Sequence, residues 1–200
     1  MSKTNESASP RAWQRMLSGR RLNLLDPSPL DVEITDIALG LSRVTRWNGQ
    51  TNGTEPYSVA EHSLLVERLF TENSSEKHSK WRLAALLHDA PEYVIGDMIS
   101  PVKKQIGNSY LDLEKKLQEA IHIRFGLPAI IPKNIKTKIK IADRKAAWIE
   151  ATEIAGFDLK EADKYFLEPD QIIMKKCKIV LKDPLKTREE FLNIYKKLDQ

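Results

Sequence analysis

The stretch from Leu83 to Asp97, LAALLHDAPEYVIGD, places the strongest constraint on what this chain can fold into. Its first five residues are all apolar, so the segment is expected to run through the protein core. It then carries His88, Asp89 and Glu92. Buried charged groups are normally paired or bound to a metal ion, because an isolated charge is costly to remove from water. We therefore expect other segments to bring partners to these three side chains.

The hydrophobic pattern of the chain predicts helices and no strand. Apolar residues recur with a helical period, and the alternation typical of strands is not found. Ser58, followed three residues later by Glu61, is typical of a capping box at a helix start. Pro91 is expected to kink or restart the helix that carries His88, because proline clashes with the carbonyl four residues back. The expected helices are 12–17, 31–42, 58–70, 81–90, 110–125, 134–155, 163–166, 169–181 and 188–198, with loops at 22–29, 43–57 and 96–108. The predicted fold class is all-α.

Length and composition set the class of protein. Two hundred residues are enough for one domain with a sizeable core. We expect a disordered tail at residues 1–10 and a single domain over residues 11–200, with C-terminal helices packed on it. The net charge is only +4 on a chain with 30% charged residues. Aromatic residues do not cluster between the basic ones, which argues against a nucleic-acid surface.

Cysteine content and the N-terminus bear on the cellular compartment. The single cysteine, Cys177, excludes an internal disulfide and fits a reducing compartment. The first ten residues are polar and lack the apolar core of a signal peptide. No apolar run approaches the roughly 18 residues of a membrane span. These features predict no membrane association and a cytoplasmic location.

Two further residues have the chemistry to join the buried pair His88 and Asp89. His62 is followed at once by apolar residues on its predicted helix, and Asp143 is flanked by core residues on another. Two imidazoles and two carboxylates suit a divalent transition metal with open positions for water and substrate. One histidine beside an apolar face is more often a satisfied core residue. Agreement among three separate segments favours the metal site.

Three motifs resemble those of the HD-domain metal-dependent phosphohydrolases: SVAEHS around His62, LLHDAPE around His88 and ADRKAA around Asp143. Their order and helical settings match that superfamily from about residue 12 to residue 156. Within it, the chain most resembles bacterial 5′-deoxynucleotidases and their relatives. Further shared motifs are RW at 46–47, YSVAEH from 57, GD at 96–97 and PVK from 101. The resemblance implies an HD-domain helical bundle, a single divalent metal ion and hydrolysis of a phosphate ester.

The resemblance also implies roles for individual residues. The metal ligands it implies are His62, His88, Asp89 and Asp143. Glu92 matches the acid just after the HD pair, and Asp97 matches a second active-site acid. Arg46 and Trp47 match a substrate-contacting pair. Lys103 stands where a basic residue can meet phosphate.

The chemistry of these residue types agrees with such roles. Glu92 or Asp97 can orient a water molecule or protonate the leaving 5′ oxygen. A guanidinium at Arg46 can hold a phosphate in bidentate fashion, and Trp47 can pack on sugar or base. Structural alternatives stay open: Arg46 and Trp47 as a surface charge beside a core aromatic, Asp97 as a turn residue, and Lys103 as solvated surface.

The favoured function is hydrolysis of (deoxy)nucleoside 5′-monophosphates to nucleoside and phosphate by a metal-dependent phosphohydrolase. Alternatives are a deoxynucleoside triphosphate triphosphohydrolase and a non-catalytic nucleotide-binding HD protein. A guanosine tetraphosphate hydrolase fits less well, because those enzymes resemble the pattern HDxxED and here Tyr93 follows Glu92. A cyclic-nucleotide phosphodiesterase fits less well, because such sites usually draw on more histidines for a second metal. The ligand types suit manganese, cobalt, iron, nickel or zinc. The expected partner is a small-molecule nucleotide, and the resemblance is compatible with a homodimer.

Overall fold

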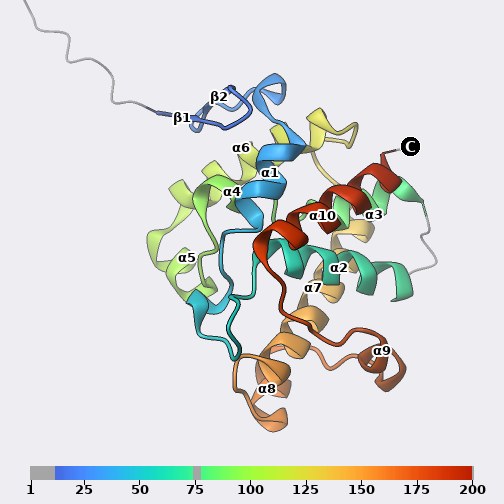
Figure 1. The fold of residues 1–200 in the computed structure, drawn as a ribbon. Coiled ribbons are helices and arrows are strands. Elements are labelled where there is room, and N and C mark those ends of the chain that lie inside the picture. The colour runs from blue at the N-terminus through green and yellow to red at the C-terminus, as the bar shows by residue number, and fades with distance from the viewer. Residues whose placement is uncertain (1–11, 74–77, 200) are drawn as a thin grey trace, which may run out of the picture.

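The computed structural model describes residues 12–73 and 78–199, which form helices around a central helix, with one small β-hairpin (Figure 1). The α-helices of the described residues are α1 (Ile34–Leu41), α2 (Val59–Asn73), α3 (Ser79–Leu86), α4 (Glu92–Ile95), α5 (Ser100–Ile106), α6 (Asn108–Arg124), α7 (Lys133–Glu153), α8 (Leu159–Tyr165), α9 (Gln171–Lys176) and α10 (Pro184–Leu198). The hairpin pairs β1 (Trp13–Arg15) with β2 (Arg21–Asn23), and the 3-10 helices are η1 (Pro29–Asp31) and η2 (Trp47–Gly49). The prediction of a mainly helical fold is confirmed.

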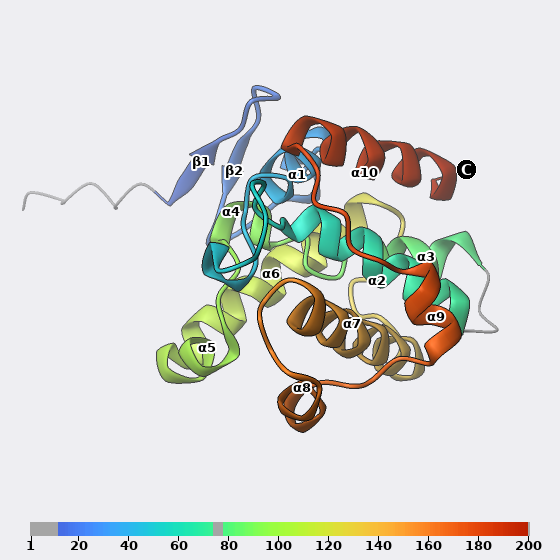
Figure 2. The same ribbon diagram turned by 60° about the horizontal axis from the view of Figure 1, so that its bottom comes forward.

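Helix α2 is the central element of the bundle. It packs against α7 on one side and α10 on the other, with α3 alongside, and Figures 1 and 2 show the same order. The predicted capping box forms at its start: the Glu61 backbone N–H donates to Ser58 Oγ at 3.3 Å, and the Ser58 N–H donates to Glu61 Oε2 at 2.9 Å. Most of the helix is buried, even the acid Glu67, whose carboxylate accepts a hydrogen bond from Arg82 at 2.7 Å. A helix buried on nearly all sides holds its side chains in fixed positions, which suits a site residue such as His62.

The apolar segment that ends in the HD pair runs through the core as expected. Residues 83–87 are at most 3% exposed. Helix α3 ends at Leu86, and α4 begins at Glu92 directly after Pro91, so the predicted restart is confirmed. Gly40 of α1 permits the close approach of α4, because a Cβ at this position would lie 2.7 Å from the Tyr93 carbonyl oxygen. The α1–α4 contact therefore helps to place Glu92.

The predicted helix at residues 12–17 is wrong, because this segment forms the first strand of the hairpin. Trp13 pairs with Asn23, and Gly19 takes a φ of +90° in the turn between the strands. The Arg21 guanidinium lies 4.0 Å from the centre of the Trp13 ring, a cation–π contact across the two strands. The strand β2 also occupies part of the predicted loop 22–29.

The predicted loop at 96–108 is also wrong in its middle, where residues 100–106 form α5. Pro101 lies in the first turn of α5, where a helix tolerates proline because the backbone N–H at that position makes no hydrogen bond within the helix. The loop at 43–57 contains the short helix η2. The predicted tail at residues 1–10 lies outside the described residues.

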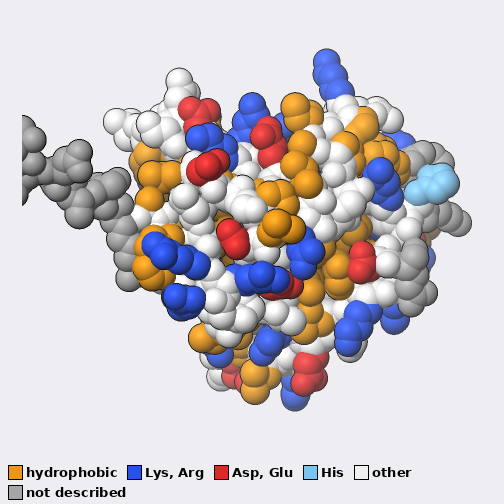
Figure 3. Space-filling view, turned by 90° about the horizontal axis from the view of Figure 1, so that it is seen from above, with side chains coloured by type: hydrophobic (Ala, Val, Ile, Leu, Met, Phe, Trp, Pro, Cys, Tyr) orange, Lys and Arg blue, Asp and Glu red, His pale blue; other side chains and the backbone are white. Residues whose placement is uncertain are grey.

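The C-terminal region packs on the rest of the bundle. Helix α10 contacts α1, α2 and α3, and its Phe191 is fully buried. Within the described parts of the chain, no helix combines the length and apolarity needed to cross a membrane. On the face drawn in Figure 3, basic and acidic side chains are interspersed rather than gathered by sign.

Candidate metal centre and active site

The structure brings together the four residues predicted as metal ligands. His62 comes from α2, His88 and Asp89 from the turn between α3 and α4, and Asp143 from the middle of α7. The Nε2 atom of His62 lies 3.3 Å from His88 Nε2, 3.4 Å from Asp89 Oδ2 and 3.3 Å from Asp143 Oδ1. His88 Nε2 and Asp89 Oδ2 are 3.2 Å apart. Two ligand atoms about 2.1 Å from one tetrahedral ion lie about 3.4 Å apart. The ligand atoms of His62, His88 and Asp143 all lie within 4.8 Å of one another, so these three residues could hold one metal ion, with Asp89 beside both histidines.

Hydrogen bonds fix the orientation of both imidazoles. His62 Nδ1 lies 2.5 Å from Oε1 of Glu150, and His88 Nδ1 lies 2.9 Å from the Ala85 carbonyl oxygen. A carboxylate or carbonyl oxygen only accepts, so each Nδ1 carries a proton. When the rings are neutral, both Nε2 lone pairs face the same point with no hydrogen between them. A cation at that point satisfies both, and a partner on Nδ1 is the usual support for a metal-binding histidine.

The electrostatics of the site also favour a cation at His62 Nε2. Burial and the nearby Arg46 guanidinium act to lower the pKa of His62. The carboxylates around the ring outweigh them and raise this pKa well above its usual value. These carboxylates stabilise a positive charge at Nε2, which either a proton or a metal ion can supply. The donor set, its spacing and its charge therefore fit a divalent ion.

Glu150 is a site residue that the sequence interpretation missed. Its side chain is fully buried on α7, and its carboxylate accepts hydrogen bonds from His62, Arg46 and Trp47, with the Tyr57 hydroxyl at 3.4 Å. Burial would raise the pKa of Glu150, but the Arg46 and His62 beside it lower that pKa to about 2. A signal was present, because residue 150 lies seven positions after Asp143 and shares its helix face.

Arg46 and Trp47 are built into the wall of the site through Glu150. Arg46 Nε and Trp47 Nε1 each donate to Glu150 Oε2 at 3.0 Å. The Trp47 ring packs edge-on against Phe157 and Phe166, with ring centres 5.6 and 5.8 Å apart. The backbone of Trp47 takes a φ of 57°, in the left-handed region that costs a non-glycine residue energy. The surroundings hold this conformation, and they fix the guanidinium beside the metal cluster.

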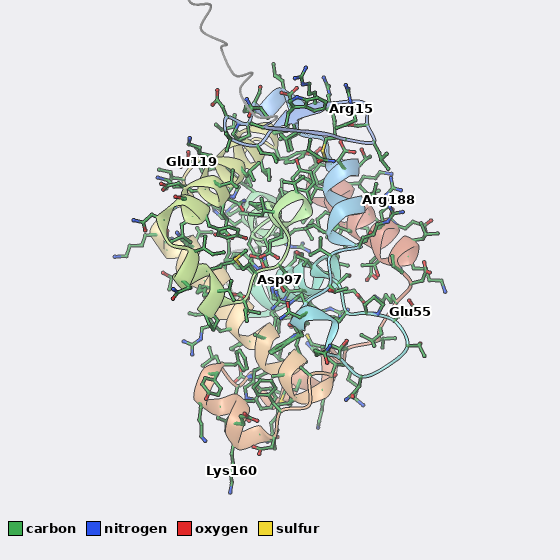
Figure 4. All side chains as sticks on the ribbon, turned by 90° about the vertical axis from the view of Figure 1, so that its left-hand side faces the viewer. Arg15, Glu55, Asp97, Glu119, Lys160 and Arg188 are labelled. Carbon is green, nitrogen blue, oxygen red and sulfur yellow. The ribbon has the colours of Figure 1, made fainter. Side chains whose placement is uncertain are left out.

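Asp97 lies on the other side of the Arg46 guanidinium. Arg46 Nη1 is 3.8 Å from Asp97 Oδ2 and 3.9 Å from Asp89 Oδ2. Burial raises the pKa of Asp97, and the charge of Arg46 opposes that effect. The Asp97 side chain is only 13% exposed. In Figure 4 Asp97 lies near the middle of the view, whereas Lys160 and Glu55 project from the edge of the molecule. The position is therefore part of the site rather than an exposed turn.

Glu92 and Lys103 lie in contact with each other near the cluster. Glu92 is buried, and its Oε2 has no hydrogen-bond partner among the described residues. Burial, with the charges of Asp89 and Asp97, raises the pKa of Glu92 to about 9. Lys103 Nζ lies 3.5 Å from Glu92 Oε1 and 2.7 Å from Glu114 Oε1, so the ammonium group of Lys103 contacts two acidic side chains.

The other two histidines lie outside the cluster. His78 is exposed at the start of α3. His122 is buried on α6, where its Nδ1 lies 3.0 Å from the Ala129 carbonyl oxygen and its Nε2 lies 2.7 Å from Gln118 Nε2. Both ring nitrogens of His122 therefore have partners within the fold.

Comparison with known proteins agrees with this geometry. Residues 37–178 match the family described as 5′-deoxynucleotidase YfbR-like. An uncharacterized protein of Rhodobacter capsulatus is 58% identical over 181 residues, covering 90% of this chain and 92% of the relative. The uncharacterized protein YfdR of Escherichia coli is 32% identical over 113 residues, covering 56% of each chain. Among solved structures, the cyanophage S-2L HD phosphohydrolase DatZ, bound to dA and one catalytic Zn²⁺ ion, matches with a TM-score of 0.50. It is 19% identical, and the match covers 84% of this chain and 97% of DatZ.

The fold and the site define a metal-dependent phosphohydrolase of the HD-domain class. The chain belongs to the 5′-deoxynucleotidase YfbR-like family, whose match spans most of its length. The predicted superfamily, the helical fold class and the enzyme class, a nucleotide phosphohydrolase, are therefore confirmed.

Proposed function

We propose that this enzyme hydrolyses deoxynucleoside 5′-monophosphates to deoxynucleosides and orthophosphate. The proposal assigns the single divalent metal ion to four ligands, His62, His88, Asp89 and Asp143. The observation that carries it is the convergence of the two histidine Nε2 atoms at 3.3 Å, each with its Nδ1 proton held by an acceptor. The family description names the same activity.

The phosphate is positioned by the residues around the cluster. A divalent ion bound there lowers the pKa of its water and draws negative charge from the phosphoryl oxygens. Arg46 keeps Nε on Glu150, and its Nη1, less than 4 Å from carboxylates of Asp89 and Asp97, is placed to bind a phosphoryl oxygen. Because Glu150 also holds His62, the arginine and the metal ligand share one rigid support. This arrangement orients the phosphate before reaction.

Glu92 is proposed to supply the proton for the leaving 5′ oxygen. Its raised pKa keeps the carboxyl protonated near neutral pH, and Oε2 has no competing partner among the described residues. A metal ion at the cluster would lower this pKa towards the working range of a general acid. Lys103 contacts the other oxygen of Glu92 and holds the carboxyl in place. Asp97 would position Arg46, and Trp47 would pack on the sugar.

Several finer predictions belong to the same proposal. The enzyme is expected to work in the cytoplasm as one domain over residues 11–200, and a homodimer is compatible with it. The donor set accepts manganese, cobalt, iron, nickel or zinc. None of these choices alters the roles given to the site residues.

Product analysis tests the proposal. Chelator-treated protein is supplied with each divalent metal in turn and incubated with mono-, di- and triphosphates of deoxyribo- and ribonucleosides. We expect orthophosphate from deoxynucleoside monophosphates, none with Asp143→Asn, and wild-type release with Asp112→Asn, an exposed acid on α6. Tripolyphosphate from triphosphates would instead identify a triphosphohydrolase. Nucleotide binding with no phosphate released in the presence of any of the metals would identify a binding protein.

A further inference from the structure

A cavity of about 510 Å³ lies beside the metal cluster, between α6 and α7. His88, Asp89 and Asp143 form part of its wall. Much of the remaining wall is apolar, from Leu111, Ala129, Ile130, Ile131 and Ile139. Charged side chains also line it, from Lys103, Glu114, Lys115, Glu119, Lys136 and Lys140. A cavity of this size that combines apolar surface with polar groups can hold a small organic ligand.

One polar side chain in this wall, Gln118, is held in a single orientation. Its Nε2 donates to the Leu87 carbonyl oxygen at 3.0 Å and to His122 Nε2 at 2.7 Å. His122 Nδ1 faces the Ala129 carbonyl oxygen at 3.0 Å and must carry the ring proton, so Nε2 is the acceptor. Burial also lowers the pKa of His122, which keeps the ring neutral. Both amide hydrogens of Gln118 are therefore used, and its orientation follows from two independent acceptors.

With both amide hydrogens bonded, the amide oxygen of Gln118 is the atom of this group still able to accept a hydrogen bond. No described residue donates a hydrogen bond to it. A fixed acceptor beside the apolar part of the wall favours a ligand with a flat ring and an N–H group, because that bond satisfies both partners out of water. The four DNA bases all have a ring face and at least one N–H. The cavity begins at the metal ligands, so a base in it would belong to the same molecule as a phosphate at the metal.

We propose that this cavity holds the base of the nucleotide substrate and that the Gln118 amide oxygen accepts a hydrogen bond from a base N–H. This inference rests on the proposed function, because it takes the reacting phosphate to lie at the cluster. Gln118 is then a base-binding residue, and His122 is a positioning residue that fixes the amide. Glu119, the neighbour of Gln118 on α6, also lines the cavity and is labelled in Figure 4.

Kinetics with and without a base test this assignment. The variant Gln118→Met keeps the side-chain length and removes the acceptor, and Gln171→Met, at an exposed position on α9, is the control. For the preferred deoxynucleoside monophosphate, kcat/KM is expected to fall at least about fivefold in Gln118→Met. For 2-deoxyribose 5-phosphate, which has no base, the change should stay within about twofold. An equal loss for both substrates would show that Gln118 only supports the fold, and would overturn the inference.

Two further measurements separate this inference from the proposed function. A monophosphate whose base analogue lacks every N–H should react more slowly with the wild type, with no further loss in Gln118→Met. Calorimetry should show that deoxynucleosides without phosphate bind more weakly to Gln118→Met than to Gln171→Met. Nucleoside binding that depends on Gln118, in a protein that releases no phosphate, would support the cavity assignment and contradict the proposed reaction. Phosphate release with equal nucleoside binding by both variants would support the proposed reaction and contradict the cavity assignment.

Discussion

Replacing Glu150 by glutamine tests whether one buried carboxylate supports both the metal ligand and the phosphate clamp. Oε1 lies 2.5 Å from His62 Nδ1, and Oε2 accepts from Arg46 Nε and Trp47 Nε1 at 3.0 Å. Glutamine has one acceptor oxygen, so its NH₂ group must face either His62 or the Arg46–Trp47 pair. In either case a donor meets a donor, and the ring or the guanidinium loses its fixed orientation.

The expected magnitude follows from the hydrogen bonds that are lost. Losing the partner that orients a metal-binding histidine typically costs about 10- to 100-fold in metal affinity or activity. At about 1.4 kcal/mol for each factor of ten, this corresponds to roughly 1.4–2.8 kcal/mol. A hydrogen bond to a charged group is worth about 1.5–3 kcal/mol, so the two magnitudes agree. We therefore expect Glu150→Gln to bind its metal about 10- to 100-fold more weakly.

A chelator competition assay measures this effect. The metal Kd is determined for the wild type, for Glu150→Gln and for Glu161→Gln, an exposed acid on α8 that serves as the control. Unfolding of the metal-free proteins in urea shows whether the variant is folded under the assay conditions. A folded Glu150→Gln protein whose metal Kd stays within twofold of the wild type would refute the reasoning, because Glu150 would then have no influence on His62.

Three other substitutions have defined outcomes. Glu92→Gln is expected to retain the metal but lose about 10²- to 10⁴-fold in kcat, since Glu92 is assigned to proton transfer; a metal analysis showing an empty site would contradict that role. Gly40→Ala should gain about 1 kcal/mol in helix propensity, yet its Cβ would lie 2.7 Å from the Tyr93 carbonyl oxygen, a clash that costs about 1–3 kcal/mol. Urea unfolding should therefore show a net loss, unlike exposed Thr35→Ala, and a more stable Gly40→Ala would disprove the close packing. Burial lowers the pKa of His122 in the folded protein. Below pH 6.5, the pKa of the ring in the unfolded chain, the unfolded state therefore binds a proton that the folded state does not, and the free energy of unfolding falls as the pH falls. The wild type should thus lose more unfolding free energy than His122→Gln between pH 7.5 and pH 5, and a difference that does not change with pH would contradict a lowered pKa.

The parts of the fold with a strong pattern could be predicted from the sequence. The capping box at Ser58, the apolar run before His88 and the restart at Pro91 each combine a local rule with burial, and the structure contains all three. The hairpin was missed because its strands have three residues each, too few for an alternating pattern. Helix α5 was missed because a proline in a first helical turn resembles a loop signal when no periodic apolar stripe follows.

The site shows a similar division between what is local and what depends on packing. His88 and Asp89 were visible as charged residues at the end of an apolar run. His62 and Asp143 joined them as an imidazole and an acid beside apolar residues, and the resemblance implied that all four are ligands. Glu150 was missed because an acid on a long, charged helix is usually solvated, and only the packing of α7 against α2 buries it beside His62. The contact of Lys103 with two acidic side chains also depends on packing, since Lys103 of α5 meets Glu92 of α4 and Glu114 of α6.

The most direct measurement is a titration of metal into chelator-treated protein while orthophosphate release from a deoxynucleoside 5′-monophosphate is followed. One ion held by His62, His88, Asp89 and Asp143 predicts no release at the start, a plateau at one equivalent of metal, and neither binding nor release in Asp143→Asn. Full release from metal-free protein, or release that needs a second equivalent, would contradict a single metal centre at these four residues.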